Sequence, residues 1–360
     1  MLLAASTHGY WNLQTLWFFL IVVLWTGYFV LEGFDFGVGM LTPAIGRTTA
    51  ERGVLLRTIA PVWDGNEVWL LVAGGATFAA FPGWYASLFS GFYLALFIVL
   101  VGLIVRGVAI EYRNKREDDQ WRRRWDYVHA GASAVPALLW GVALADVVHG
   151  VPTDAHGQVT ADLLDLLGPY ALFGGLTSLA LFAFHGSIFL TLRTTGELEQ
   201  RARRLSLRLA MPASALVLGF LVWTYVNAAS AHNKGIVPGV IPIAAICAPF
   251  AAGALQRAGR TGLAFTATAV AIALTTLTLF LNLYPRVIVS STNNAYSPTI
   301  WTTSSSHYTL TVMSVIALLF TPIVLLYQTW SYWVFRARVT GTDAPTPAQA
   351  LAASPLGKSS

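Results

Sequence analysis

The chain has 360 residues, of which 56% are hydrophobic and only 11% are charged, with a formal net charge of +5. Soluble domains carry roughly 25% charged residues, so this composition excludes a large apolar soluble enzyme whose whole surface faces water. A single cysteine, Cys247, excludes an intrachain disulfide and a cysteine-ligated metal cluster, and its apolar surroundings predict a small packing residue. The 13 tryptophans and 13 tyrosines suit side chains that anchor helices at the two surfaces of a bilayer.

Nine apolar segments follow one another along the chain, and each is long enough to cross a membrane as a helix. They cover residues 13–33, 55–80, 86–110, 127–148, 166–192, 209–229, 237–256, 262–283 and 308–334. Because the connections are short, we predict an all-α integral membrane protein with a single domain, residues 1–339. A weak parallel repeat at a spacing of 150 residues matches Phe34 with Phe184 and favours two four-helix bundles plus one peripheral helix.

Residues 340–360 are small, polar and proline-rich, and are predicted to form a disordered tail.

Basic residues are unevenly distributed between the two sets of connections. Nineteen of the 22 lysines and arginines fall on one side of the predicted membrane, within residues 47–57, 113–124, 193–208, 257–260 and 336–358. Lys234 and Arg286 fall on the other side, and Arg106 lies inside the third predicted span. Because cytoplasmic loops are enriched in basic residues, we predict a multi-pass protein with its N-terminus outside and its C-terminus in the cytoplasm.

Four acidic residues lie in or beside the first two predicted spans: Glu32, Asp35, Asp64 and Glu67. Each pair is spaced i, i+3, which places both carboxylates of a pair on one face of a helix. If the second span starts near Leu55, Asp64 lies roughly 13 Å inside the membrane, whereas Asp35 lies near the cytoplasmic surface and is partly hydrated. Arg106 is at a similar depth and is expected to pair with Asp35 or Asp64.

Two interpretations of these charges remain open. A charged side chain inside a membrane costs several kcal/mol, so each one needs a partner, water or a function. The acids and Arg106 could form a buried ion-pair cluster that only fixes helix packing, or they could relay protons. Four acids against one arginine favour the relay, because at least one carboxyl group is then expected to carry a proton. The same pattern would suit a proton- or cation-coupled transporter, which is the alternative function.

Histidines give little support to a haem-carrying protein. His129 and His307 begin predicted spans, His185 lies inside one, and no predicted span carries two histidines. We therefore expect His185 to be a hydrogen-bonded interior residue, and we expect no bound haem or metal.

Several segments resemble subunit II of cytochrome bd-type quinol oxidases over most of the first 335 residues. The more specific matches are GFDFGVGMLT (33–42) and IAPVWDGNEVWL (59–70), followed by FSGFY (89–93). Supporting matches are VRGVAIEYRNK (105–115), RTTGEL (193–198) and the SST…SSSHYTL stretch (290–310). This sequence departs from the family's pattern at Glu67, where an amide is usual, and at Glu32, where an aspartate is usual.

The resemblance implies a nine-helix, haem-free subunit in the inner membrane of a bacterium. Its partner, subunit I, carries two b-type haems and one d-type haem, oxidises quinol and reduces oxygen to water. The second subunit stabilises the first and contributes to the cytoplasmic proton intake path, in which the acid of WDGN, Asp64, is implicated together with Glu67, Asp35, Glu32 and Arg106.

Trp69 matches a residue near the mouth of a proposed oxygen channel. Some members hold a tightly bound quinone, and this sequence leaves open both that cofactor and small accessory subunits with a single helix.

Overall fold

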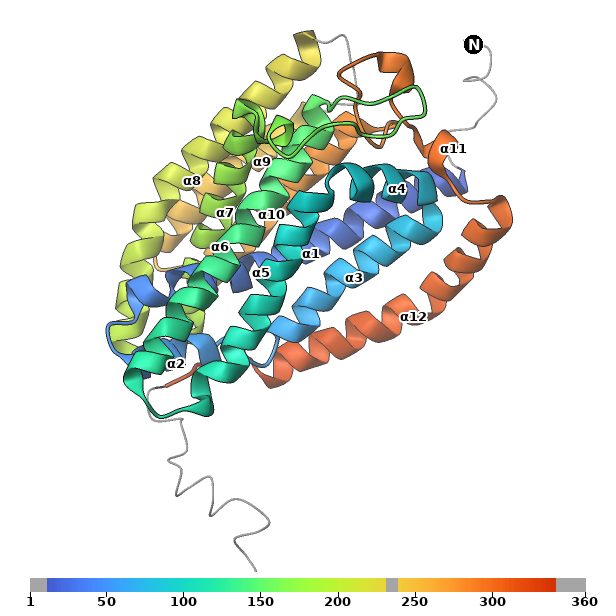
Figure 1. The fold of residues 1–360 in the computed structure, drawn as a ribbon. Helices are drawn as coiled ribbons and strands as arrows, with labels where there is room; N and C mark the ends of the chain where they lie inside the picture. Colours follow the sequence, from blue (N-terminus) through green and yellow to red (C-terminus); the bar gives the residue numbers. More distant parts are fainter. Residues whose placement is uncertain (1–11, 231–238, 341–360) are drawn as a thin grey trace, which may run out of the picture.

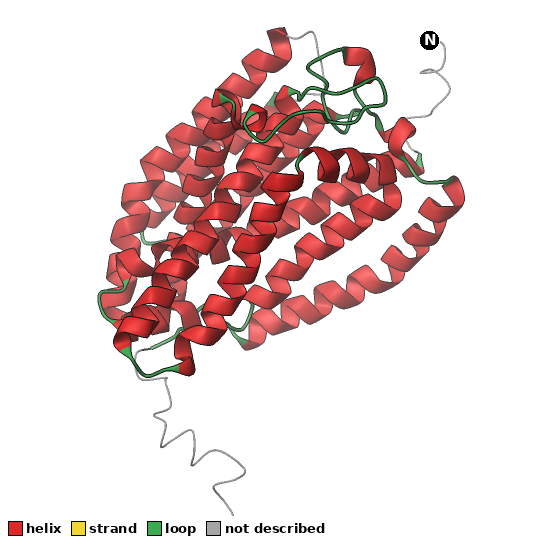
Figure 2. Ribbon diagram, in the orientation of Figure 1, coloured by secondary structure: helices red, strands yellow, loops and turns green. Residues whose placement is uncertain are grey.

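The computed structural model describes residues 12–230 and 239–340, and within them the chain is almost entirely helical (Figure 2). The long helices are α1 (Leu13–Ile45), α3 (Trp63–Ala80), α5 (Tyr93–Tyr112), α6 (Asp119–His149), α7 (Pro169–Arg193), α8 (Gly196–Ser230), α9 (Val240–Arg257), α10 (Thr261–Leu283) and α12 (His307–Val334). The short helices are α2 (Thr49–Arg57), α4 (Pro82–Gly91) and α11 (Ile300–Thr303). Residues 341–360 of the predicted tail lie outside the described residues.

Eight helices in the described residues have both the length and the apolar composition of a membrane span: α1, α5, α6, α7, α8, α9, α10 and α12. Helix α3 runs among them (Figure 1). Its 18 residues extend over about 27 Å, close to the thickness of a hydrocarbon core. The polar residues at its start lower its hydropathy, so α3 is the remaining helix of the predicted nine.

Two predicted spans are divided by breaks in the helix. The prediction of one helix over 55–80 was wrong, because α2 ends at Arg57, a turn covers residues 58–62, and α3 then begins at Trp63. Pro61 lies in this turn, where its ring and missing N–H disfavour a continuous helix. The prediction over 86–110 was wrong in the same way, since α4 and α5 meet at the non-helical Phe92.

The helices form two four-helix groups, as the sequence predicts. Helix α1 packs on α3, α6 and α7, and α5 packs on α6, which defines a first group of α1, α3, α5 and α6. Helix α7 packs on α8 and α10, and α9 packs on both α8 and α10, which defines a second. Helix α12 lies at the edge of the molecule beside α3 (Figure 1).

Helix α12 is attached mainly by side-chain hydrogen bonds. Trp17 of α1 donates to Ser314 at 3.0 Å, and Trp69 of α3 donates to Gln328 at 2.8 Å. Only 6% of the apolar stretch that could cross the membrane is buried, so nearly all of the apolar surface of α12 stays exposed in this chain. A polar contact inside an apolar medium has few competitors, so a small number of hydrogen bonds can hold a peripheral helix.

Two glycines bring the two groups of helices together at α1 and α7. A Cβ atom at Gly37 would lie 2.1 Å from the carbonyl oxygen of Phe182, and one at Gly186 would lie 2.6 Å from backbone atoms of Gly37. Beside this contact, the rings of Phe34 and Phe189 stack with centroids 4.2 Å apart. Small residues at the crossing therefore allow the backbones to touch, as in many membrane helix pairs.

Helix α2 joins both groups at one end of the bundle. Arg201 of α8 donates to Glu51, which also accepts from the backbone N–H groups of Arg47 and Thr48. The hydrogen bond from Arg201 and those from the backbone lower the pKa of Glu51 from its ordinary value of 4.5 to about 2.

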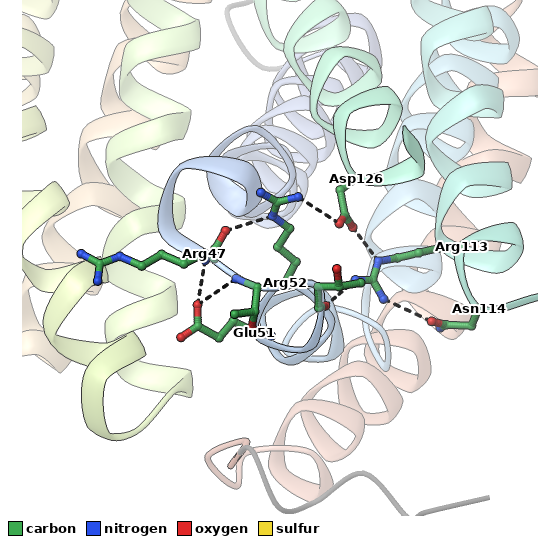
Figure 3. A network of polar contacts seen from close by, with 9 residues as sticks. Arg47, Glu51, Arg52, Arg113, Asn114 and Asp126 are labelled. Carbon is green, nitrogen blue, oxygen red and sulfur yellow. Dashed lines mark hydrogen bonds and ion pairs between the residues drawn. The ribbon is translucent and has the colours of Figure 1, made fainter. Parts of the chain in front are cut away.

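On its other side, α2 contributes Arg52 to Asp126 of α6. Asp126 also accepts a 2.5 Å hydrogen bond from Nε of Arg113, while Arg52 is 3.6 Å away (Figure 3). Nη2 of Arg113 donates to the carbonyl oxygen of Thr49, the first residue of α2, at 2.7 Å. Helix α2 is thus fixed between α6 and α8 by buried or half-buried charges.

We expect Gly186→Ala to destabilise the protein, because the added methyl group would lie against the backbone of α1. Overpacking of this kind costs about 1–3 kcal/mol, and a rigid backbone neighbour favours the upper part of that range. Thermal unfolding in detergent, followed by tryptophan fluorescence, measures the effect. Gly131→Ala is the matched control, since a Cβ at Gly131 meets nothing within 4 Å. Equal melting temperatures for both variants would contradict the close contact.

We expect Glu51→Gln to lower stability at neutral pH and to lose that effect in acid. Because the folded pKa of about 2 lies below the ordinary 4.5, the stabilisation is complete above about pH 5 and is lost as the pH falls towards about 2. The difference in melting temperature between wild type and Glu51→Gln should therefore narrow steadily below about pH 4.5. The exposed Glu117→Gln is the control, and a pH-independent difference for Glu51→Gln would contradict the assignment.

Candidate functional site

Among the described residues, Arg106 of α5 is the largest side chain that is fully buried, at 0% exposed. Its Nη1 donates to Glu32 of α1, and its guanidinium lies over the ring of Phe36 with its central carbon 4.9 Å from the centroid. The expectation that Arg106 pairs with Asp35 or Asp64 was wrong. Residues three apart on a helix point about 60° apart, so Glu32 faces α5 while Asp35 faces α3.

Asp35 belongs to a separate hydrogen-bond chain that links three helices. Asn66 of α3 donates to Asp35 at 2.7 Å, and the hydroxyl of Tyr332 on α12 donates to Asn66 at 2.6 Å. Asp35 is 0% exposed, and α1 continues past it to Ile45. The expectation that Asp35 is partly hydrated near the end of a span was therefore wrong, because the helix is longer than its apolar segment.

Asn66 and Tyr332 are candidate site residues that the sequence analysis did not identify. Asn66 lies in the WDGNE segment between the two acids and is fully buried. The sequence did contain a signal for Asn66, because an amide side chain inside a predicted span needs hydrogen-bond partners within the protein. Nothing local in the sequence links Tyr332 to this site, because only the packing of α12 brings it there.

Asp64 and Glu67 lie at the start of α3, on its outer side. Asp64 is in the first turn and is exposed at the surface of this chain, whereas Glu67 is partly buried. Oε2 of Glu67 is buried and has no protein partner among the described residues. The expected depth of Asp64 assumed a continuous helix from Leu55, and the turn at residues 58–62 removes that assumption. Asp64 instead lies near the end of a membrane-length helix, with Glu67 about one turn deeper.

The outer face of α3 continues beyond these acids as an apolar surface with glycines. Leu71 and Phe78 are 71% and 58% exposed, and a Cβ atom at Gly65 or Gly75 would have no neighbour within 4 Å. A groove of about 480 Å³ separates this face from α4 and α5 and is lined largely by leucine and aromatic side chains. A carboxylate thus lies at the edge of a face that would otherwise suit lipid or another apolar helix.

Trp69 of α3 lies between α1 and α12. Its six-membered ring lies against Gly27, where a Cβ atom would be 2.2 Å from Cζ3, and its Nε1 donates to Gln328 of α12. Trp69 is therefore a packing contact for the peripheral helix as well as a candidate for the role implied by the family resemblance.

His185 is a hydrogen-bonded interior residue, which confirms the prediction made for it. Its Nδ1 lies 2.6 Å from the hydroxyl of Thr268, its Nε2 lies 3.2 Å from the carbonyl oxygen of Val30, and its ring stacks on Phe265. The prediction that Cys247 is a packing residue was wrong, because its side chain is exposed on α9. The described part of the chain contains no group of three or more side chains suited to bind a metal ion.

Comparison with known proteins identifies the family to which this arrangement of helices belongs. Residues 13–335 match the family described as cytochrome bd terminal oxidase subunit II. A Bacillus subtilis (strain 168) protein, cytochrome bd ubiquinol oxidase subunit 2, is 40% identical over 335 residues, which cover 93% of this chain and 99% of that protein. The cytochrome bd-I ubiquinol oxidase subunit 2 of Escherichia coli (strain K12) is 35% identical, over 92% of this chain and 96% of that protein.

A solved structure supports the fold. A chain in the structure of bd oxidase from Geobacillus thermodenitrificans superposes with a TM-score of 0.72 at 18% identity, covering 89% of this chain and 97% of that one. The family match extends through α1, α3, α5 and α12, which carry Glu32, Asp35 and the residues that contact them. This chain therefore belongs to the cytochrome bd terminal oxidase subunit II family, whose members are subunits of a quinol:oxygen oxidoreductase.

Proposed function

We propose that this chain is the haem-free subunit II of an oxidase that oxidises quinol and reduces oxygen to water. Its haem-bearing partner, subunit I, holds the b and d haems, and this chain stabilises that partner and supplies part of its cytoplasmic proton intake path. The names of the relatives from Bacillus subtilis and Escherichia coli support the reaction class. Both ring nitrogens of His185 are engaged by protein atoms, which supports a chain without an axial haem ligand at that position.

The family membership favours this function over the transporter. Acidic residues inside the membrane would by themselves suit either an oxidase subunit or a transporter, because both functions need protonatable groups there.

The observation that carries the proposal is the outward position of Asp64 on α3. A carboxylate facing hydrocarbon is strongly disfavoured, so this residue needs water or a polar partner on its outer side. The surrounding face, with exposed Val68, Leu71 and Phe78 and open positions at Gly65 and Gly75, suits close packing of another apolar helix. We therefore place the contact with subunit I on the α3 face, with Asp64 at the boundary between the two chains.

The buried groups behind this face then provide the inner part of a proton path. Glu67 lies one turn deeper than Asp64 and has a buried carboxylate oxygen without a protein partner in the described residues. Asp35 of α1 is connected by hydrogen bonds through Asn66 of α3 to Tyr332 of α12. Reduction of oxygen consumes protons, and a haem inside the membrane can receive them only along polar groups and water.

Three further assignments belong to the same proposal. Trp69 lies near the mouth of an oxygen channel, a bound quinone is an optional cofactor, and small single-helix subunits are optional partners. The exposed position of much of α12, next to Trp69, supports a surface on which such partners can lie.

We expect Asp64→Asn to assemble with its haems and to lose most oxygen consumption, by about tenfold or more, because an amide keeps the shape but cannot exchange a proton. Residual activity should fall further in Asp64→Asn/Glu67→Gln if Glu67 provides a bypass. Quinol-driven oxygen uptake by the purified complex, normalised to haem content, measures both.

Asp162→Asn, in an exposed loop, is the matched control for the charge change. A purely structural cluster would produce loss of haem before loss of turnover. Full activity of the haem-replete double variant would contradict the relay.

The orientation of the chain is part of the proposal, with the basic connections at the α2 end in the cytoplasm. In a Cys247→Ser background, cysteines at Glu117 and Ala155, both exposed in the structure, serve as probes. An impermeant thiol reagent applied to spheroplasts should label Ala155→Cys and label Glu117→Cys only after lysis. The reverse pattern would invert the topology.

A further inference from the structure

A second set of buried polar groups lies between α1, α5 and α6, away from the α3 face. His129 of α6 is 1% exposed, and neither of its ring nitrogens has a protein partner in the described chain. Nε and Nη2 of Arg106 and Oε2 of Glu32 are also buried without protein partners there. Such groups are rare in folded proteins, and bound water is their most frequent partner.

The register of α5 against α6 places these groups in sequence along one path. The two helices are joined by the short segment 113–118 and are tied at that end by the Arg113–Asp126 contact. His129 lies one turn from Asp126, about 4.5 Å along α6, and Arg106 lies two turns from Arg113, about 10 Å along α5. His129 therefore lies between the Arg113–Asp126 contact and the Arg106–Glu32 pair.

Helix α1 closes the third side of this path through a glycine. A Cβ at Gly39 would lie 2.9 Å from Cε1 of His129 and 2.1 Å from Oγ of Ser133. The hydroxyl of Ser133 donates to the carbonyl oxygen of His129 at 2.8 Å, so it does not satisfy the ring. The imidazole is enclosed by packing but its nitrogens are left for small ligands.

The outer end of the path opens on a cavity whose lining combines charged side chains with a larger apolar area. This cavity has a volume of about 550 Å³ and is lined by α2, the end of α5 and residues 195, 197 and 198, with Arg113 in its wall. Arg113 and Arg52 meet Asp126 at this point (Figure 3). Arg113 thus belongs both to the wall of the cavity and to the contact with Asp126, which lies one helical turn from His129.

We propose that these groups form a hydrated inlet, separate from the Asp64 face, that leads from the cavity through Arg113–Asp126 and His129 to Arg106–Glu32. Water is the ligand, and His129 is a positioning residue that holds it. A neutral imidazole offers one donor and one acceptor, so it can join water on both sides. The carboxylates of Asp126 and Glu32 offset the adjacent guanidinium groups. This inlet rests on the proposed proton intake and adds a second branch to it.

The test compares apolar and polar replacements of His129 in the purified oxidase complex. His129→Leu and His129→Met remove the water-binding nitrogens, whereas His129→Gln keeps a donor and an acceptor. Each is made in the wild-type and Asp64→Asn backgrounds, and oxygen uptake per haem is recorded. Val128→Leu is the matched control, because Val128 is the adjacent residue and is 41% exposed.

We expect His129→Leu and His129→Met to lower turnover several-fold, with a much larger loss beside Asp64→Asn, while His129→Gln and Val128→Leu stay close to their parents. If His129 has only a structural role, the variants should rank differently in activity. An apolar replacement would then remove buried nitrogen atoms that have no partners, so it should be tolerated. Full turnover of both apolar variants in both backgrounds would overturn the inlet. A glutamine variant as impaired as leucine would overturn the water-holding role.

A comparison of the Asp64→Asn and His129→Leu complexes distinguishes failure of this inference from failure of the proposed function. An active Asp64→Asn complex together with an impaired His129→Leu complex would reject the Asp64 relay and retain the inlet. The opposite result would retain the relay and reject the inlet. If His129→Leu does not assemble, His129→Met decides the outcome, and loss of haem in both would assign His129 to assembly and reject the inlet.

Discussion

The cost of placing charge inside a hydrocarbon layer governs this structure. Most of the chain meets that constraint by having few charges, and several of the charges that remain are paired, hydrogen-bonded or turned towards an open face. Arg106 and Glu32 neutralise each other between α5 and α1, whereas Asp35 has an amide as its partner and Asp64 faces outward. Each of these arrangements depends on how the neighbouring helices are placed, so the positions of the charges and the packing of the bundle depend on each other.

The separation of these charges has a functional consequence. A single neutral cluster would account for helix packing and nothing more, since every charge would be matched within it. Here the arginine close to the acids is committed to Glu32, and no ion pair gives Asp35, Asp64 or Glu67 a cationic partner in the described chain. Carboxyl groups without cations are the kind of group that can bind and release protons inside a membrane.

The two ends of the bundle differ in how they are held together. At the α2 end, ion pairs and charge-assisted hydrogen bonds connect α2 to α6 and α8. In the centre, contact depends on the absence of side chains at Gly37 and Gly186. Along the edge, α12 is attached by hydrogen bonds that involve Trp17, Trp69 and its own Tyr332, and most of its apolar surface is exposed. Asp64 lies on the exposed face of α3, the helix beside α12, as expected where a partner subunit supplies the missing surface.

The sequence by itself determined the membrane class, the helical architecture and two of the buried acids, Glu32 and Asp35. Length and hydropathy set the number of spans, because a bilayer has a fixed thickness and leaves no water for the backbone. It also indicated the family through the segments around Asp35 and Asp64. It did not determine where helices break, since the turn at 58–62 and the break at Phe92 lie inside segments that were predicted as single spans.

Only the tertiary structure decided which charges meet. Spacing along one helix shows that Glu32 and Asp35 share a broad face, but a difference of about 60° is enough to send them to different neighbours. The pairing of Arg106 with Glu32, and the approach of Tyr332 to Asn66, depend on the rotation and tilt of helices far apart in the chain. These are properties of packing between helices, and no local pattern of residues contains them.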